Sequence, residues 1–124
     1  MDLVSIIIPY YKKKKYISTT INSAINQSYK NIEIIIVYDD ENYDDLKLLE
    51  EIKKKDERIR IIKNKKKMGA GLSRNKGISS SKGNYIAFLD ADDTWETDKL
   101  SKQMSFMTNN NYLVSHTSYQ IVDE

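Results

Sequence analysis

The chain has 124 residues, of which 40% are hydrophobic and 31% are charged, and its formal net charge is +2. This length suits one compact domain with a single core. The absence of cysteine excludes a disulfide framework and a thiolate zinc site. The opening MDLVSIIIPYY is apolar for too short a stretch to span a bilayer, and Asp2 stands where a signal peptide carries cations. We therefore expect a cytoplasmic protein.

The first half of the chain alternates strand-like and helix-like segments. Residues 3–8 are predicted to form a strand, and residues 14–27 a helix, because apolar side chains recur there at helical spacing. Residues 32–37 are rich in β-branched side chains and predict a strand that is buried on both faces. A second helix is expected from Leu46 to Ile52.

The second half continues the alternation. A strand is predicted over 58–62, followed by the KMGAG turn and a helix that carries Leu72 and Ile78. Another strand is predicted over 85–89, and a helix over 97–108 with Thr97 as its N-cap. The residues from 112 onward again read as a strand. Such alternation is typical of βαβ units, and it predicts an α/β, Rossmann-like, mostly parallel sheet with helices on both faces.

The lysines are concentrated in three runs, at 12–15, 53–55 and 63–67. Such runs attract anionic partners, but they are more often solvated faces. The two later runs contain no interleaved aromatic residues on which bases could stack, so we expect no nucleic-acid partner. We interpret all three runs as solvated surface.

Chemically distinctive residues follow each predicted strand. In a parallel sheet the carboxyl ends of the strands share one edge, and ligands bind there. The residues at that edge are Pro9, Tyr10 and Tyr11 after the first strand, Asp39 and Asp40 after the second, Arg74 in the turn after the third, and Asp90, Asp92 and Asp93 after the fourth. Their convergence predicts a ligand-binding crevice.

The aspartates after the fourth strand predict a cation site. Two carboxylates about 4 Å apart repel each other by roughly 4 kcal/mol at an effective dielectric constant near 20, and a bound cation removes this penalty. Oxygen ligands without His or Cys favour Mg²⁺ or Mn²⁺, which keep positions open for substrate phosphates. We expect Asp92 to bind the metal with Asp90 beside it, and Asp93 to stabilise the local loop.

The other edge residues allow two interpretations each. Asp39 could accept a hydrogen bond from the ring N–H of a base, or it could be a turn residue. Tyr11 could stack on that base, whereas Tyr10 is expected to pack. Arg74 could bind phosphate or pair with an aspartate of the edge.

Two motifs resemble those of other enzyme classes. GAGLSR, at 69–74, has the first two glycines of a dinucleotide fingerprint, but Arg74 replaces the third. FLDADDT, at 88–94, fits the aspartate-nucleophile phosphatases, with Asp90 as nucleophile and Asp92 as acid/base. That motif normally opens its domain, however, whereas three βα units precede it here.

The segments 4–40 and 69–95 resemble family 2 glycosyltransferases. They contain in order Pro-x-Tyr, Ser-x-x-x-Gln, an acidic strand end, Arg-Asn-x-Gly, Gly-x-Tyr-Ile and Asp-x-Asp-Asp. The resemblance implies a GT-A fold that binds a nucleotide sugar, usually of uridine diphosphate, with Mn²⁺ or Mg²⁺ as cofactor. It also implies the roles of the site residues: Pro9 and Arg74 line the nucleotide site, Tyr11 stacks on the base, Asp39 reads its N–H, Asp90 lies near ribose and metal, and Asp92 binds the metal.

The resemblance further implies transfer to an acceptor hydroxyl with inversion, in surface glycan or polysaccharide biosynthesis. The family's acceptor half and catalytic base follow the Asp-x-Asp segment. We therefore expect residues 1–124 to form a single domain, the nucleotide-sugar-binding half, with the acceptor half absent and the general base beyond Glu124. A non-catalytic nucleotide-binding module is the alternative.

The expected partners are the sugar donor and a glycan or lipid-linked acceptor. Peripheral contact with the inner face of the membrane and pairing of the exposed sheet edge with a second copy are further expectations. Two positions depart from the family pattern. YDDEN, at 38–42, replaces Asp-Asp-Gly-Ser, and Lys12 replaces a frequent asparagine.

Overall fold

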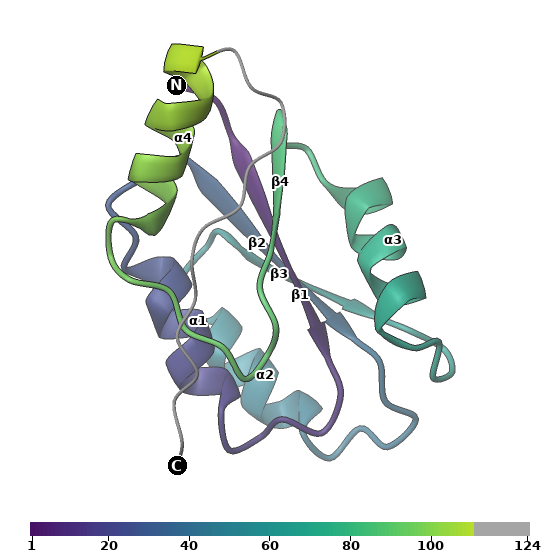
Figure 1. The fold of residues 1–124 in the computed structure, drawn as a ribbon. Helices are drawn as coiled ribbons and strands as arrows, with labels where there is room; N and C mark the ends of the chain where they lie inside the picture. Colours follow the sequence, from purple (N-terminus) through teal and green to yellow (C-terminus); the bar gives the residue numbers. More distant parts are fainter. Residues whose placement is uncertain (111–124) are drawn as a thin grey trace.

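The computed structural model describes residues 1–110, in which strands and helices alternate along the chain (Figure 1). The strands are β1 (Val4–Tyr10), β2 (Ile32–Tyr38), β3 (Ile59–Lys63) and β4 (Tyr85–Phe88). The helices are α1 (Ile17–Ile25), α2 (Leu46–Lys53), α3 (Ala70–Ser80) and α4 (Lys99–Asn110). Each strand and helix predicted before residue 111 is present, and the predicted strand from 112 onward lies outside the described residues.

The four strands form one sheet in the order β3-β2-β1-β4, and every neighbouring pair is parallel. β1 and β2 are central, and β2 is buried at every position, as its apolar sequence predicted. The Rossmann-like α/β prediction is confirmed. Because all strands point the same way, their carboxyl ends share one edge.

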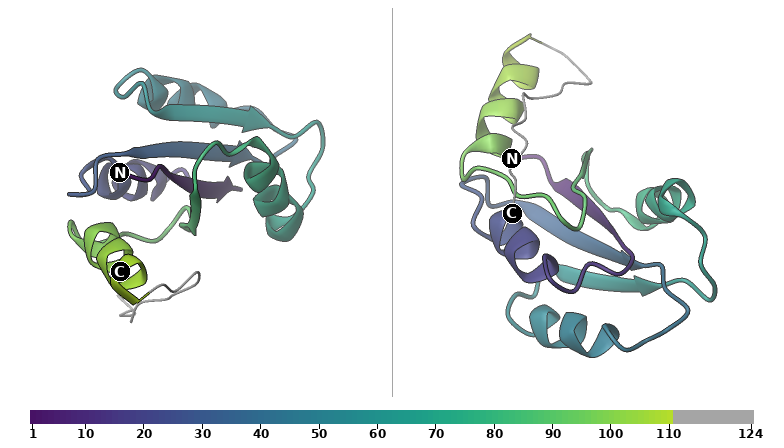
Figure 2. Two further views of the ribbon diagram at one scale, coloured as in Figure 1. Left: turned by 90° about the horizontal axis from the view of Figure 1, so that it is seen from above. Right: turned by 60° about the horizontal axis from the view of Figure 1, so that its bottom comes forward.

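Helices cover both faces of the sheet (Figures 1 and 2). Alternate residues of β1 and β2, such as Ile6 and Ile34, pack against α1, α2 and α4 in the larger core cluster. The residues between them, such as Ile7 and Ile35, form the smaller cluster on the opposite face, where α3 lies against β1 and β2. The alternation of side chains along each strand thus supplies two separate cores.

Helix α3 packs in a way that its apolar residues did not predict. Leu72 and Ile78 are 54% and 42% exposed, and the buried positions of α3 are Ser73 and Gly77. A Cβ atom on Gly77 would lie 2.5 Å from Cγ2 of Ile7. The helix therefore approaches the sheet through small residues, and hydrophobic periodicity gives no sign of that face.

Two predicted helix starts were also wrong. α1 begins at Ile17 rather than at 14, because residues 14–16 form a turn. α4 begins at Lys99, so Thr97 is not its N-cap. The carbonyl of Thr97 instead accepts a hydrogen bond from the N–H of Ser28 at 2.8 Å. The side chain of Gln27 accepts the N–H of Leu100 at 3.0 Å and so satisfies a donor in the first turn of α4.

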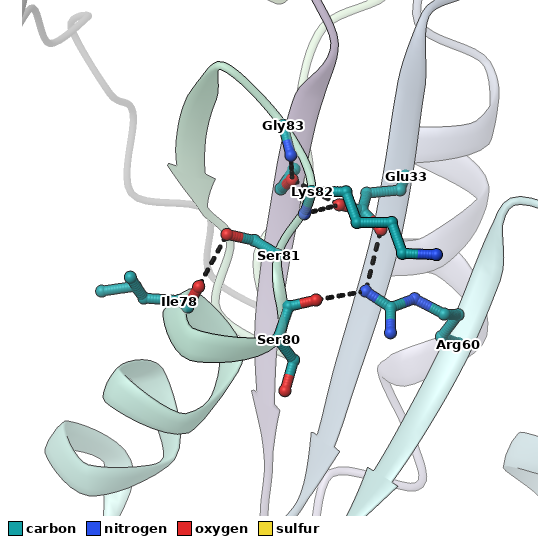
Figure 3. Close-up of polar contacts among 8 residues, drawn as sticks. Glu33, Arg60, Ile78, Ser80, Ser81, Lys82 and Gly83 are labelled. Atoms are coloured by element: carbon teal, nitrogen blue, oxygen red, sulfur yellow. Dashed lines mark hydrogen bonds and ion pairs between the residues drawn. The ribbon is translucent and has the colours of Figure 1, made fainter.

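A buried carboxylate, Glu33, organises the sheet edge where the strands begin (Figure 3). It accepts hydrogen bonds from Ser5 Oγ and the N–H of Lys82, both at 2.6 Å, and from Arg60 Nη2 at 2.9 Å. The N–H of Gly83 bonds to Ser5 Oγ at 2.8 Å, and a Cβ there would lie 2.5 Å from that oxygen. This network holds the α3–β4 connection against β1 and β2.

None of the helices within residues 1–110 has the length and apolar character needed to cross a bilayer.

Candidate functional site

A pocket of about 350 Å³ opens at the edge where the strands end. This volume falls within the range of about 300–1,000 Å³ that is typical of small-molecule sites. All six residues that the sequence nominated line it: Pro9, Tyr11, Asp39, Arg74, Asp90 and Asp92. They come from the ends of β1, β2 and β4 and from the first turns of α3. The predicted convergence of these residues is therefore observed.

Asp39 is buried and already holds three hydrogen bonds. Its Oδ1 accepts from the N–H of Met68 at 2.6 Å and from Asn64 Nδ2 at 3.0 Å, and its Oδ2 accepts from the N–H of Gly69 at 2.8 Å. Burial raises the pKa of Asp39, but these bonds and the charge of Lys67 outweigh it and lower the pKa. A carboxylate has about four acceptor positions, so Asp39 has one left for a ligand.

The glycine after the third lysine run shapes this loop. Gly69 has φ of +90°, in the left-handed region that glycine tolerates best, and stands directly before α3. Its carbonyl accepts the N–H of Ser73 at 3.0 Å. The turn thereby directs its own N–H and that of Met68 to Asp39.

The two tyrosines at the end of β1, Tyr10 and Tyr11, differ in exposure as predicted. Tyr10 is fully buried, stacks on Tyr38 with ring centroids 5.4 Å apart, and donates its hydroxyl to Asp45 at 2.6 Å. Tyr11 is 37% exposed. The ammonium of Lys67 lies 4.1 Å from the Tyr11 ring centroid, within cation–π range. Tyr11 is thus the tyrosine whose ring is available to a ligand.

The backbone explains why an asparagine is frequent where this chain has Lys12. Lys12 has φ of +51°, and it is the only non-glycine residue with positive φ within residues 1–110. Asparagine is several-fold enriched in this left-handed conformation, whereas other side chains pay for it sterically. The departure from the family pattern therefore retains the turn at a local energetic cost.

The two aspartates expected at the metal each have a cationic partner. Asp90 Oδ1 accepts from Arg74 Nη2 at 3.2 Å, and Asp92 Oδ2 lies 3.4 Å from Lys13 Nζ. Their side chains are 55% and 41% exposed. Of the two interpretations of Arg74, the structure shows the ion pair, and it also places Arg74 in the pocket lining.

The three lysine runs are solvated as interpreted, since each of their lysines is exposed except the half-buried Lys13, but two of these lysines also belong to the site. Lys13 and Lys67 line the pocket together with the predicted residues. Their position in the sequence could have indicated this, because Lys13 follows β1 and Lys67 precedes Gly69 at the same sheet edge. A run of lysines by itself does not show which of its members borders a pocket.

Negative charge accumulates in the loop after β4. The N–H of Asp93 donates to the carbonyl of Asp90 at 3.0 Å, which closes a tight turn. Burial and the charges of Asp90 and Asp92 raise the pKa of Asp93. Residues 1–110 contain no group of three or more His, Cys, Asp or Glu side chains that could hold a metal alone. One or two carboxylates completed by substrate phosphates are nevertheless a common Mg²⁺ site, and this oxygen-only pair fits it.

Polar side chains in α1 and just after it hold the acidic loop in place. The contacts are Thr20 Oγ1 to Ala91 O at 2.9 Å, the N–H of Trp95 to Ser23 Oγ at 3.1 Å, and Gln27 Nε2 to Glu96 O at 2.6 Å. Ser23 and Gln27 are the first and last residues of the Ser-x-x-x-Gln motif. The motif therefore positions the residues that follow Asp92, a role that the sequence alone did not reveal.

The chain was compared with known proteins. The family model described as Glycosyl transferase family 2 matches residues 5–124. WfaP of Escherichia coli, a UDP-Glc:alpha-D-GlcNAc-diphosphoundecaprenol beta-1,3-glucosyltransferase, is 46% identical over 121 residues, covering 98% of this chain and 47% of WfaP. The curated relatives are longer, since the matches span between 17% and 49% of their lengths.

Two solved structures share the fold. Staphylococcus aureus TarS 1-349 in complex with UDP-GlcNAc has a TM-score of 0.79 and 23% identity, covering 87% of this chain and 32% of that one. The mannosyltransferase PcManGT from Pyrobaculum calidifontis, in complex with GDP-Man and Mn²⁺, has a TM-score of 0.79 and 16% identity, covering 86% and 32%. The fold is that of the GT-A glycosyltransferases, and the chain belongs to glycosyl transferase family 2.

Proposed function

We propose that this chain is the donor-binding part of an inverting, metal-dependent glycosyltransferase that takes a sugar from a uridine diphosphate sugar. One observation carries the proposal. An exposed tyrosine, a buried aspartate and two half-exposed aspartates from separate strand ends line a single pocket together with an arginine of α3. These are the groups that a base, a diphosphate and a divalent cation require. The family membership of the chain supports the same conclusion.

The acceptor capacity of Asp39 supports uracil as the base. Uracil presents one ring N–H, at N3, between two carbonyl groups, whereas guanine presents N1–H beside an amino group. Asp39 retains one acceptor position after its bonds to Asn64, Met68 and Gly69. The single N–H of uracil would fill that position, whereas guanine would bring two donors to it. A buried donor left unpaired costs about 1–3 kcal/mol. Tyr11 supplies the ring on which the base stacks.

The diphosphate would lie between Arg74 and the loop after β4. Arg74 binds and orients phosphate oxygens, and Asp92 with Asp90 holds Mn²⁺ or Mg²⁺. When bound, the metal neutralises the charge that develops on the leaving diphosphate. The oxygen-only donor set supports this assignment. We assign Asp90 a contact with the ribose as well.

Inversion requires a base that deprotonates the acceptor hydroxyl for direct displacement. The aspartates lining the pocket are Asp39, Asp90 and Asp92, and each is already assigned to the donor. We therefore place the base and the acceptor half beyond Glu124, in agreement with the greater length of the relatives. The diphosphoundecaprenol in the name of WfaP supports a lipid-linked glycan as acceptor, in polysaccharide biosynthesis at the inner face of the membrane.

Two alternatives carry different expectations. A non-catalytic nucleotide-binding module would bind the nucleotide but transfer no sugar even as the full gene product, so a transfer assay on that product separates it from an enzyme. An aspartate-nucleophile phosphatase would form a phospho-aspartate at Asp90. The phosphatase has lost support, because the whole chain from residue 5 matches the glycosyltransferase family.

Calorimetry tests the proposed donor and metal. We expect the chain to bind UDP in the presence of Mn²⁺, and Asp92→Asn to weaken that binding about tenfold or more. Asp98→Asn is the matched control, because Asp98 also pairs with a lysine, Lys102 at 3.0 Å, but lies directly before α4 and outside the pocket lining. Equal UDP affinities in Asp92→Asn and Asp98→Asn would contradict the metal assignment.

A further inference from the structure

The ion pair between Lys13 and Asp92 joins two loops that are far apart in the sequence. Lys13 lies between β1 and α1, and Asp92 follows β4, with 3.4 Å between Nζ and Oδ2. The backbone of Lys13 is fixed, because its carbonyl accepts the N–H groups of Tyr16 and Ile17, both at 3.0 Å. The side chain is 42% exposed and lines the pocket. A fixed anchor therefore carries a flexible cation that can move within the site.

The charges that line the pocket are balanced. The three cations are Lys13, Lys67 and Arg74, and the three aspartates are Asp39, Asp90 and Asp92. A divalent cation that takes Asp92 as a ligand must compete with the ammonium group for the same carboxylate. Once the cation is bound, that ammonium group faces a pocket that has gained two positive charges and a diphosphate. Phosphate oxygens are then a compatible new partner for it.

We propose that Lys13 exchanges partners on donor binding: it neutralises Asp92 in the free protein and contacts the diphosphate once a divalent cation occupies Asp92. The inference rests on the proposed function, and it adds a residue of this chain to the donor site. Lysine suits such an exchange because its ammonium is a compact charge on a four-carbon flexible stem. The half-exposed ion pair with Asp92 is weak enough to be broken, since such pairs change an equilibrium about two- to fivefold.

The exchange predicts effects of opposite sign in a single variant. Lys13→Met keeps the aliphatic stem and removes the charge. Without nucleotide, Lys13→Met should bind Mn²⁺ two- to fivefold more tightly, about the worth of the competing ion pair, when free Mn²⁺ is measured by electron paramagnetic resonance. With Mn²⁺ saturating, it should bind UDP about tenfold more weakly by calorimetry, because a charge-assisted contact with phosphate is lost.

Lys14→Met is the matched control, because Lys14 is the exposed neighbour in the same run and does not line the pocket. It should leave both affinities near those of the wild type. Lys13→Arg should retain most of the UDP affinity. A purely structural role for Lys13 would lower both affinities together and would also lower the melting temperature.

The outcomes separate this inference from the proposed function. If the wild-type chain binds no UDP with Mn²⁺, both fail. If the wild type binds UDP but Lys13→Met matches Lys14→Met, or if its two affinities move in the same direction, the exchange alone is wrong. Tighter Mn²⁺ binding together with weaker UDP binding supports it.

Discussion

The carboxylate of Asp39 accepts a hydrogen bond from the N–H of Gly69 at 2.8 Å. This contact connects the end of β2 to the turn that begins α3. The residue proposed to read the base is therefore also a structural element of the sheet edge. Its position is fixed before any ligand arrives, because the same carboxylate binds Met68 and Asn64.

We expect Asp39→Asn to lower both stability and UDP affinity. Both oxygens of Asp39 accept backbone N–H groups, so the NH₂ group of an asparagine would have to face the N–H of Gly69 or Met68. A buried donor without an acceptor costs about 1–3 kcal/mol. Urea denaturation would measure this loss of unfolding free energy. Asp40→Asn is the control. One oxygen of Asp40 accepts a hydrogen bond from the N–H of Asn42, and the amide oxygen of an asparagine can accept the same bond. Similar unfolding free energies for the two variants would argue against the role of Asp39 in the loop.

Two glycines of α3 should respond oppositely to alanine. A Cβ on Gly77 would lie 2.5 Å from Ile7, so Gly77→Ala should destabilise the protein by about 1–3 kcal/mol through overpacking. A Cβ on Gly71 would meet no atom within 4 Å, so Gly71→Ala should stabilise it by about 0.5–1 kcal/mol through helix propensity. Thermal unfolding of both variants tests the packing of α3 against β1. Equal effects would mean that the helix does not approach the sheet through Gly77.

Glu33 should make the stability of the fold depend on acidity. Burial raises its pKa, but the bonds from Ser5, Lys82 and Arg60 outweigh burial and lower the pKa. A lowered folded-state pKa stabilises the protein fully above the unfolded value of about 4.3, and this stabilisation is lost as the pH falls through the folded-state pKa. The unfolding free energy should therefore drop as the pH falls below about 4.

Glu33→Gln provides the comparison for that pH dependence. The glutamine side chain does not titrate, so the unfolding free energy of the variant should change less between pH 5 and pH 2. Because the variant lacks the carboxylate that accepts the bonds from Ser5, Lys82 and Arg60, its unfolding free energy should also be lower at pH 7. Chemical denaturation of both proteins across this range measures the difference. Parallel pH profiles would show that Glu33 does not contribute.

The strands and the site edge could be predicted from sequence for a clear physical reason. Buried strands such as β2 are continuous β-branched runs, and parallel connections bring the strand ends together, so the meeting of Tyr11, Asp39 and Asp90 follows from topology. The helix starts were less accurate, because a turn precedes α1 and Thr97 makes a tertiary contact instead of capping α4.

Other features depend on contacts between distant segments. The inner face of α3 consists of Ser73 and Gly77, which carry no hydrophobic pattern. Lys13 and Lys67 belong to lysine runs whose other members are mostly exposed, and only the fold shows that these two side chains reach the pocket. The functions of the pocket residues remain predictions, for which the geometry supplies the arrangement and binding experiments supply the test.

The most direct test of the central claim is the location of the nucleotide on the protein. The ¹⁵N-labelled chain would be titrated with UDP and Mg²⁺, and its backbone amide shifts followed by nuclear magnetic resonance. Our account predicts shift changes at Tyr11, Gly69 and Ala91 around the pocket, and none at Lys82 and Gly83 on the opposite sheet edge. Saturable changes at the opposite edge, or no saturable change anywhere, would contradict it.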